Sequence, residues 1–217
     1  MVDAEGVKLS RRKFFIFGSS VGISAAGSAA GADKLKPTPK QTEGPFYPIQ
    51  AQKDKDFDLT QVEGQEGVAK GEQVFIIGQV VDTEGNPIED ATVDLWQANA
   101  EGKYHHPHDK NPAPKDENFQ GWAIVPSGKE GGFKFKTIVP GAYPISKRHK
   151  RTPHIHFKVS KRGYVELTTQ MYFPDQELNE TDVILRRHPK EEQVLMIAKT
   201  DKEKADTLHY RVVLQKA

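Results

Sequence analysis

Short apolar segments separated by turns rich in glycine and proline dominate the chain from Gln73 onwards. Several of these segments alternate apolar and polar residues, which is the period of a β-strand. They are QVFIIGQVVD (73–82), ATVDLWQA (91–98), GGFKFKTIVPG (131–141), HIHFKVS (154–160), ELTTQMYF (166–173) and LHYRVVLQ (208–215). The pattern predicts an all-β fold with at least six strands, a sandwich or a barrel, and we expect an antiparallel β-sandwich.

Three other stretches complete the expected organisation. Residues 33–72 are polar and contain four prolines, so they predict an extended N-terminal arm ahead of a domain that runs from 73 to 217. The proline-rich stretch 101–119 is too long for a hairpin turn, and loops of this length in compact domains are usually functional or disordered. Only PKEEQVLMIAKT (189–200) has helical spacing, which predicts one short helix near the C-terminus.

Residues 1–32 have the order of an export signal. Arg11 and Arg12 precede an uncharged stretch, 14–32, which ends in the small residues Ala-Gly-Ala. The start SRRKFF resembles a twin-arginine signal, which predicts an exported, periplasmic protein. An uncleaved membrane anchor is the alternative, but the stretch is rich in glycine, serine and alanine and only weakly hydrophobic. We expect no stable membrane span once the signal is removed.

Composition removes several classes of function. The chain has no cysteine, so a disulfide, a thiolate nucleophile and a thiolate metal site are all excluded. Its formal net charge is +1 and its basic and acidic residues are mixed, so no nucleic-acid partner is expected. Any bound metal must therefore be held by histidine, aspartate, glutamate or tyrosine.

Two histidines stand one residue apart in RTPHIHFKV (151–159). On a strand, residues i and i+2 point to the same face, so His154 and His156 would lie side by side. In a hydrophobic core, two adjacent imidazoles would leave polar ring nitrogens without partners, whereas a metal ion can be bound by both imidazoles. The pair alone does not identify the metal.

Two tyrosines, Tyr104 and Tyr143, follow directly after predicted strands. A phenol has a pKa near 10, so it becomes an anionic ligand only beside a strongly Lewis-acidic ion such as ferric iron. Taken singly, each tyrosine is better explained as a loop or turn residue that packs its ring.

Five motifs in a fixed order change this assessment. They are LWQANAEGKYHHPHD, APKDENFQGW, FKTIVPGAYPI, RTPHIHFKVS and TQMYF. Together they resemble the intradiol ring-cleavage dioxygenases, and within that family most nearly the iron-bearing subunit of the protocatechuate 3,4-dioxygenase branch. The resemblance runs from about Thr42 to Leu214 and implies a non-haem Fe(III) ion. It assigns the metal ligands by motif position as Tyr104, Tyr143, His154 and His156.

The same resemblance implies an activity and further site residues. The substrates would be a catechol and O2, and the ring would open between its two hydroxyl-bearing carbons to give a cis,cis-muconate-type product. Tyr143 would leave the metal and take up a substrate proton, and Arg151 would stabilise negative charge on the ring. The expected substrate-binding residues are Gln170, Ile145 and Ile184.

The N-terminal motif TEGPFYP (42–48) resembles an arm that helps to build a neighbouring pocket in the two-subunit members of the family. Because one chain here holds both this arm and the ligand motifs, the resemblance implies a homo-oligomer. The chain departs from the protocatechuate enzymes at Ile145, where they carry a tryptophan in the pocket wall, so the ring substituents of the substrate stay open.

Three alternatives remain at this stage. A non-catalytic β-sandwich binding module would share the strand pattern but would not need the series of tyrosines, arginine and histidines. A periplasmic copper or zinc protein would use only the histidine pair. An extradiol enzyme would use ferrous iron with two histidines and one carboxylate, which is a different donor set.

Overall fold

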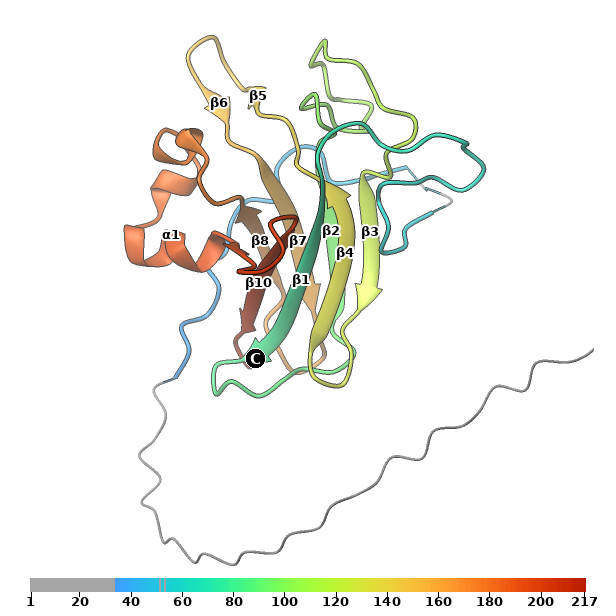
Figure 1. Ribbon diagram of the computed structural model, residues 1–217. Coiled ribbons are helices and arrows are strands. Elements are labelled where there is room, and N and C mark those ends of the chain that lie inside the picture. The colour runs from blue at the N-terminus through green and yellow to red at the C-terminus, as the bar shows by residue number, and fades with distance from the viewer. Residues whose placement is uncertain (1–33, 51, 53) are drawn as a thin grey trace, which may run out of the picture. The chain divides into compact units, whose positions relative to one another are not determined.

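The computed structural model describes residues 34–50, 52 and 54–217. Two four-stranded sheets pack face to face in this part of the chain (Figure 1). The β-sandwich predicted from the sequence is confirmed, and the predicted segments 73–82 and 154–160 match their strands at both ends. The predicted export signal, residues 1–32, lies outside the described residues.

The first sheet has the order β4-β1-β10-β9. Its strands are β4 (Gly132–Ile138), β1 (Gln73–Asp82), β10 (Thr207–Leu214) and β9 (Lys199–Thr200). Its antiparallel pairs are β1 with β4 and β10 with β9. The pairing of β1 with β10 is parallel, which departs from the antiparallel expectation.

The second sheet is antiparallel throughout and has the order β3-β2-β7-β8. Its strands are β3 (Trp122–Pro126), β2 (Thr92–Trp96), β7 (His154–Ser160) and β8 (Leu167–Tyr172). The register places Trp96 opposite His156 on one side of β7 and Gln170 opposite His156 on the other. Strand β3 was not among the predicted segments.

The core lies between the two sheets. Ile76 and Phe135 project into it from the first sheet, and Leu95 and Phe157 from the second, all without exposed surface. Because strand side chains alternate, the neighbouring residues of β2 and β7 point to the opposite face of the second sheet. Asp94, Trp96, His154 and His156 on this outer face are also buried.

The N-terminal arm covers part of the outer face of the second sheet. In the described part of residues 34–72, no helix or strand forms, as the prolines predicted. The Tyr47 hydroxyl donates a hydrogen bond of 2.8 Å to the Asp94 carboxylate. The Tyr47 ring packs edge-on against the indole of Trp96, with ring centroids 4.9 Å apart. An outer face that would normally meet water is thereby converted into a second, partly polar interior.

Short elements complete the fold. A hairpin of β5 (Tyr143–Pro144) and β6 (Lys150–Arg151) projects beyond the second sheet (Figure 1). Two 3-10 turns, η1 (Glu177–Glu180) and η2 (Leu185–Arg187), precede the predicted C-terminal helix, α1 (Lys190–Met196). Among the described residues, no helix has the length and apolar character needed to cross a membrane.

Candidate active site

Four buried side chains from three segments meet on the outer face of the second sheet. His154 and His156 come from the start of β7, Tyr143 from β5, and Tyr104 from the long loop after β2. The His154 Nε2 lies 3.4 Å from the Tyr104 hydroxyl oxygen and 3.5 Å from that of Tyr143. The His156 Nε2 lies 3.1 Å from the Tyr104 hydroxyl. The structure therefore brings together all four residues that the motifs singled out as metal ligands.

The tautomer of His154 follows from its second ring nitrogen. The His154 Nδ1 lies 2.7 Å from the carbonyl oxygen of Thr152, and a carbonyl can only accept a hydrogen bond. The Nδ1 must therefore carry the proton, which leaves a lone pair on the Nε2 that faces the two phenols. This backbone contact is the usual way in which a protein orients a metal-binding imidazole.

The imidazole of His156 is held differently. Its Nδ1 is buried and has no hydrogen-bond partner among the described residues. Instead the indole of Trp96 stacks on the ring, with centroids 4.8 Å apart and planes 9° from parallel. Stacking between cross-strand neighbours thus sets the plane of this imidazole.

Burial controls the charge state of the four groups. It lowers the pKa of His154 and of His156 well below the usual range, and the positive charge of Arg151 lowers both further, so the imidazoles are neutral. Burial also raises the pKa of Tyr104 well above its ordinary value, and it raises the pKa of Tyr143 against the opposing charge of Arg151. Only a strong positive charge placed between the phenols would ionise them.

The donor set fits a single metal ion. Two ligands that each lie about 2.1 Å from a tetrahedrally coordinated ion are about 3.4 Å apart. The separations of 3.1–3.5 Å between the facing nitrogen and oxygen atoms agree with this spacing. The two neutral imidazoles can bind a metal ion directly, whereas the two phenols become anionic ligands only beside a strong Lewis acid. This donor set suits a trivalent ion.

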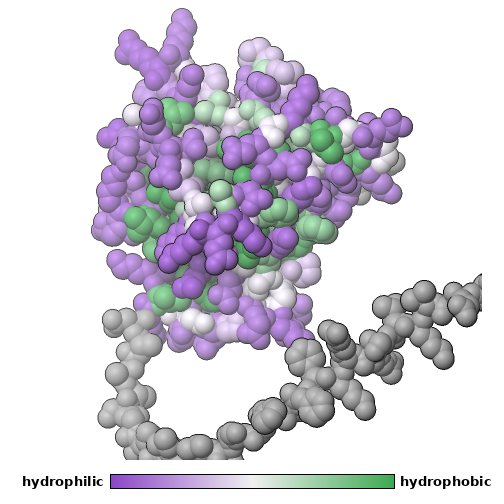
Figure 2. All heavy atoms as spheres, in the orientation of Figure 1, coloured by the Kyte–Doolittle hydropathy of each residue, from purple (hydrophilic) through white to green (hydrophobic). Residues whose placement is uncertain are grey.

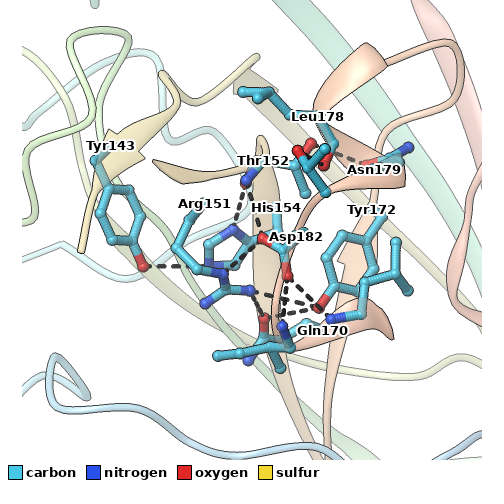
Figure 3. A network of polar contacts seen from close by, with 12 residues as sticks. Tyr143, Arg151, Thr152, His154, Gln170, Tyr172, Leu178, Asn179 and Asp182 are labelled. Atoms are coloured by element: carbon cyan, nitrogen blue, oxygen red, sulfur yellow. Dashed lines mark hydrogen bonds and ion pairs between the residues drawn. The ribbon is translucent and has the colours of Figure 1, made fainter. Parts of the chain in front are cut away.

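Arg151 lies beside this cluster and is held by a buried carboxylate. Figure 3 shows its guanidinium between the ring of Tyr143 and the carboxylate of Asp182. The Arg151 Nε donates to Asp182 Oδ2 at 2.8 Å, and the same oxygen accepts the Thr152 backbone N–H at 3.0 Å. The other oxygen, Oδ1, accepts the backbone N–H groups of Ile184 and Leu185, each at 2.9 Å.

Gln170 lies behind the arginine. It is fully buried on β8, and its Oε1 accepts a hydrogen bond of 2.5 Å from Arg151. Its amide nitrogen donates to the carbonyl oxygen of Thr42 in the arm at 3.0 Å. The sequence suggested contact with substrate, whereas the structure places Gln170 between Arg151 and the arm and outside the lining of the adjoining cavity.

A cavity of about 820 Å³ opens beside the cluster. Tyr143, Ile145, Arg151, His156 and Ile184 line it, as does the 108–112 segment of the long loop. The arm of the same chain adds Thr42, Gly44, Pro45 and Phe46. The expected pocket residues Ile145 and Ile184 thus lie at the cavity, and the loop 101–119 takes part in the site as its length suggested.

The sequence did not reveal Asp182 or the role of Trp96. Asp182 stands alone in ETDVILRRH (180–188), and no local pattern separates it from a surface acid. Trp96 was visible as a strand residue, but its contact with His156 depends on the pairing of β2 with β7. Among the loop histidines 105, 106 and 108, His106 is buried and packs against Phe46.

Comparison with known proteins identifies the family. A family profile described as "Dioxygenase" matches residues 42–216. The beta chain of protocatechuate 3,4-dioxygenase from Burkholderia cepacia is 36% identical over 159 residues, which are 72% of this chain and 68% of that protein. Hydroxyquinol 1,2-dioxygenase from Nocardioides simplex is 29% identical over 203 residues, and the match spans 85% of this chain but only 64% of that enzyme.

A solved structure supports the same assignment. The dioxygenase domain of a dioxygenase carbohydrate-binding protein fusion from Streptomyces sp. SirexAA-E superposes with a TM-score of 0.64 at 27% identity. The superposition covers 84% of this chain and all of that domain. Together with the geometry of the two phenols and two imidazoles, these matches show that the chain belongs to the intradiol ring-cleavage dioxygenase family.

Proposed function

We propose that this chain binds a non-haem ferric ion through Tyr104, Tyr143, His154 and His156 and opens the ring of a catechol with O2. The product would be a cis,cis-muconate-type diacid. Membership of the family supports the reaction class. The observation that carries the metal assignment is the convergence of two buried phenol oxygens on two buried imidazole nitrogens at 3.1–3.5 Å.

Ferric iron, when bound, would act as a Lewis acid for the two diol oxygens and make the aromatic ring reactive toward O2. The two phenolates would offset most of its charge and favour the ferric over the ferrous state. The lowered pKa values of the two imidazoles keep them neutral and available as ligands.

The two tyrosines differ in access to substrate. Tyr104 is 2% exposed, and the Asp109 carboxylate fixes its backbone N–H at 2.7 Å. Tyr143 is 9% exposed, lines the cavity and belongs to the short hairpin. This difference supports the proposal that Tyr143 would receive a proton from the incoming diol and that Tyr104 would stay bound to the metal.

Arg151 would stabilise the negative charge that develops on the ring. Its side chain lines the cavity, and Asp182 and Gln170 hold its guanidinium in place. A charged donor fixed in a water-poor site stabilises a developing anion far more than the same group in water. Ile145 and Ile184 would provide apolar contacts to the ring, while Gln170 would act through Arg151.

We also propose that the protein is exported and forms a homo-oligomer. The twin-arginine pattern at residues 10–15 supports export to the periplasm. Two of the similar proteins are the alpha and beta chains of one Burkholderia cepacia enzyme, which supports assembly of such chains. Cell fractionation and light scattering of the purified protein test these two proposals separately.

The central experiment is purification followed by three measurements on one sample: iron content, visible absorbance and ring cleavage. Ferric tyrosinate absorbs visible light, so we expect a coloured protein with about one iron per chain. Adding catechol without O2 should shift the visible band, and admitting O2 should release a muconate that ultraviolet absorbance detects. A protein that stays colourless after incubation with ferric iron would overturn the metal assignment.

A further inference from the structure

Two cationic side chains at the cavity have no role in the scheme above. Lys110, from the long loop, and Arg187, from η2, both line the cavity and are exposed. Within the described residues, neither side chain makes a hydrogen bond or an ion pair. The other charged groups of the lining are occupied, because Asp182 holds Arg151, and Asp109 accepts the backbone N–H groups of Tyr104 and Asn111.

More positive charge lies on the β5–β6 hairpin, whose residues Pro144, Ile145 and Ser146 line the cavity. The β5–β6 hairpin carries Lys147, Arg148 and Lys150 on its exposed tip, and none of these three forms an ion pair with the described residues. No acidic residue lies between 143 and 151. The end of the molecule from which this hairpin projects is predominantly hydrophilic on the surface (Figures 1 and 2). In a chain of net charge +1, this is a local concentration of cations.

The depth of the cavity separates these cations from the reacting groups. The four proposed ligands are 2–9% exposed, whereas Lys110 and Arg187 lie at the solvent edge. A cavity of about 820 Å³ also lies in the upper part of the range for sites that bind drug-sized molecules, about 300–1,000 Å³, and exceeds what a bare catechol ring fills. A ligand whose diol lies at the base can extend toward the rim.

We infer that the site is built for a catechol with an acidic side chain, whose anionic group reaches Lys110 and Arg187 at the cavity mouth. This inference rests on the proposed function for the position of the diol. A compact catechol whose acid is attached directly to the ring would extend less far from the diol toward these two exposed cations. The hairpin cations would add long-range attraction for an anionic ligand.

The test is a comparison of affinities without O2, so that turnover plays no part. The probes are 3-(3,4-dihydroxyphenyl)propionate and its primary amide, which have the same length and differ in charge. Titration calorimetry on the iron-loaded protein should show tighter binding of the acid, by about tenfold. The preference should be smaller for 3,4-dihydroxybenzoate over its amide, and it should fall as salt is added, because salt screens exposed charges.

Variants assign the preference to the two residues. The double change Lys110→Gln and Arg187→Gln should reduce the ratio of acid to amide affinity to about one. Arg162→Gln is the matched control, because Arg162 is exposed in the turn between β7 and β8, at the opposite end of β7 from the histidines. It removes one positive charge, against two in the double variant, and should leave the ratio unchanged.

The possible results separate this inference from the proposed function. Equal affinities for acid and amide in the unchanged protein, or a ratio unaffected by the double change, would overturn the anionic side-chain inference, as would failure to bind either probe. An acid preference that disappears in the double variant would support it. If that preference holds but O2 then yields no ring cleavage, the proposed function fails and the anion subsite stands.

Discussion

Asp182 joins the arginine of the active site to the segment that orients a proposed metal ligand. One carboxylate oxygen accepts hydrogen bonds from the Arg151 Nε at 2.8 Å and from the Thr152 N–H at 3.0 Å. The carbonyl of Thr152 in turn fixes His154. The buried carboxylate of Asp182 thus fixes both the Arg151 guanidinium and the backbone at Thr152, two residues before His154.

Asp182→Asn should therefore destabilise the protein strongly. Removal of one partner of a buried ion pair leaves an uncompensated charge and typically costs about 3–5 kcal/mol. We expect the free energy of unfolding, measured in urea, to fall by about 3 kcal/mol. Glu180→Gln is the control, because its ion pair with Lys190 is exposed and screened by water, so its loss should change the free energy of unfolding very little. Equal effects of the two changes would contradict a central role for Asp182.

Tyr104→Phe removes one proposed anionic ligand and little volume. We expect the visible absorbance to weaken or vanish, the iron content to fall, and ring cleavage to be lost, since the remaining donors balance less of the charge. Tyr164→Phe, in the turn after β7, makes the same chemical change away from the site and should keep all three properties. A coloured, active Tyr104→Phe protein would exclude Tyr104 as a ligand.

Arg151→Gln should separate metal binding from catalysis. Arg151 is not one of the proposed ligands, and Asp182 and Gln170 hold its guanidinium, so the visible band should persist in this variant. Removal of a fixed donor to developing negative charge typically lowers kcat by about 10²–10³-fold, and a loss in this range is expected here. Stopped-flow measurement of ring cleavage provides the rate, and normal turnover in this variant would show that the arginine has another role.

Trp96→Leu should weaken iron binding although residue 96 supplies no ligand. The indole sets the plane of His156 by stacking, and the Nδ1 of that imidazole has no hydrogen-bond partner among the described residues to replace it. Loss of a group that orients a metal ligand typically lowers metal affinity about 10–100-fold. Competition with a chelator measures this affinity. Trp96→Phe keeps an aromatic face and should retain most of it, and equal affinity in both variants would contradict the stacking role.

Asp82 should make stability depend on pH in the acid range. Burial by itself raises its pKa, but hydrogen bonds from Asn86, Glu84 and Lys216 outweigh burial and lower the pKa to about 2. Because the folded pKa lies below the unfolded value of about 4, the stabilisation is present above pH 4 and is lost as the pH falls toward 2. Urea unfolding across this range should show a weaker pH dependence for Asp82→Asn than for the unchanged protein. Identical pH profiles would exclude Asp82 as a source of the effect.

Local periodicity was sufficient to predict much of the fold and part of the site. The alternation in residues 154–160 placed His154 and His156 on one face of a strand, and β7 has those bounds. This succeeds because the side-chain period of a strand is a property of consecutive residues. The order of the motifs further predicted which two tyrosines lie with the histidines, although they are separated from them by 50 and 11 residues.

The remaining features of the fold and of the site depend on packing between residues that are far apart in the chain. The alternation in β2 distinguishes two faces but does not show that the outer face, with Asp94 and Trp96, is buried under the arm. The pairing of Arg151 with Asp182 and the presence of Lys110 and Arg187 in the lining of one cavity depend on how loops close over the sheets. Such contacts join residues far apart in the chain, and no local pattern encodes them, because their free energy exists only once the intervening strands have paired.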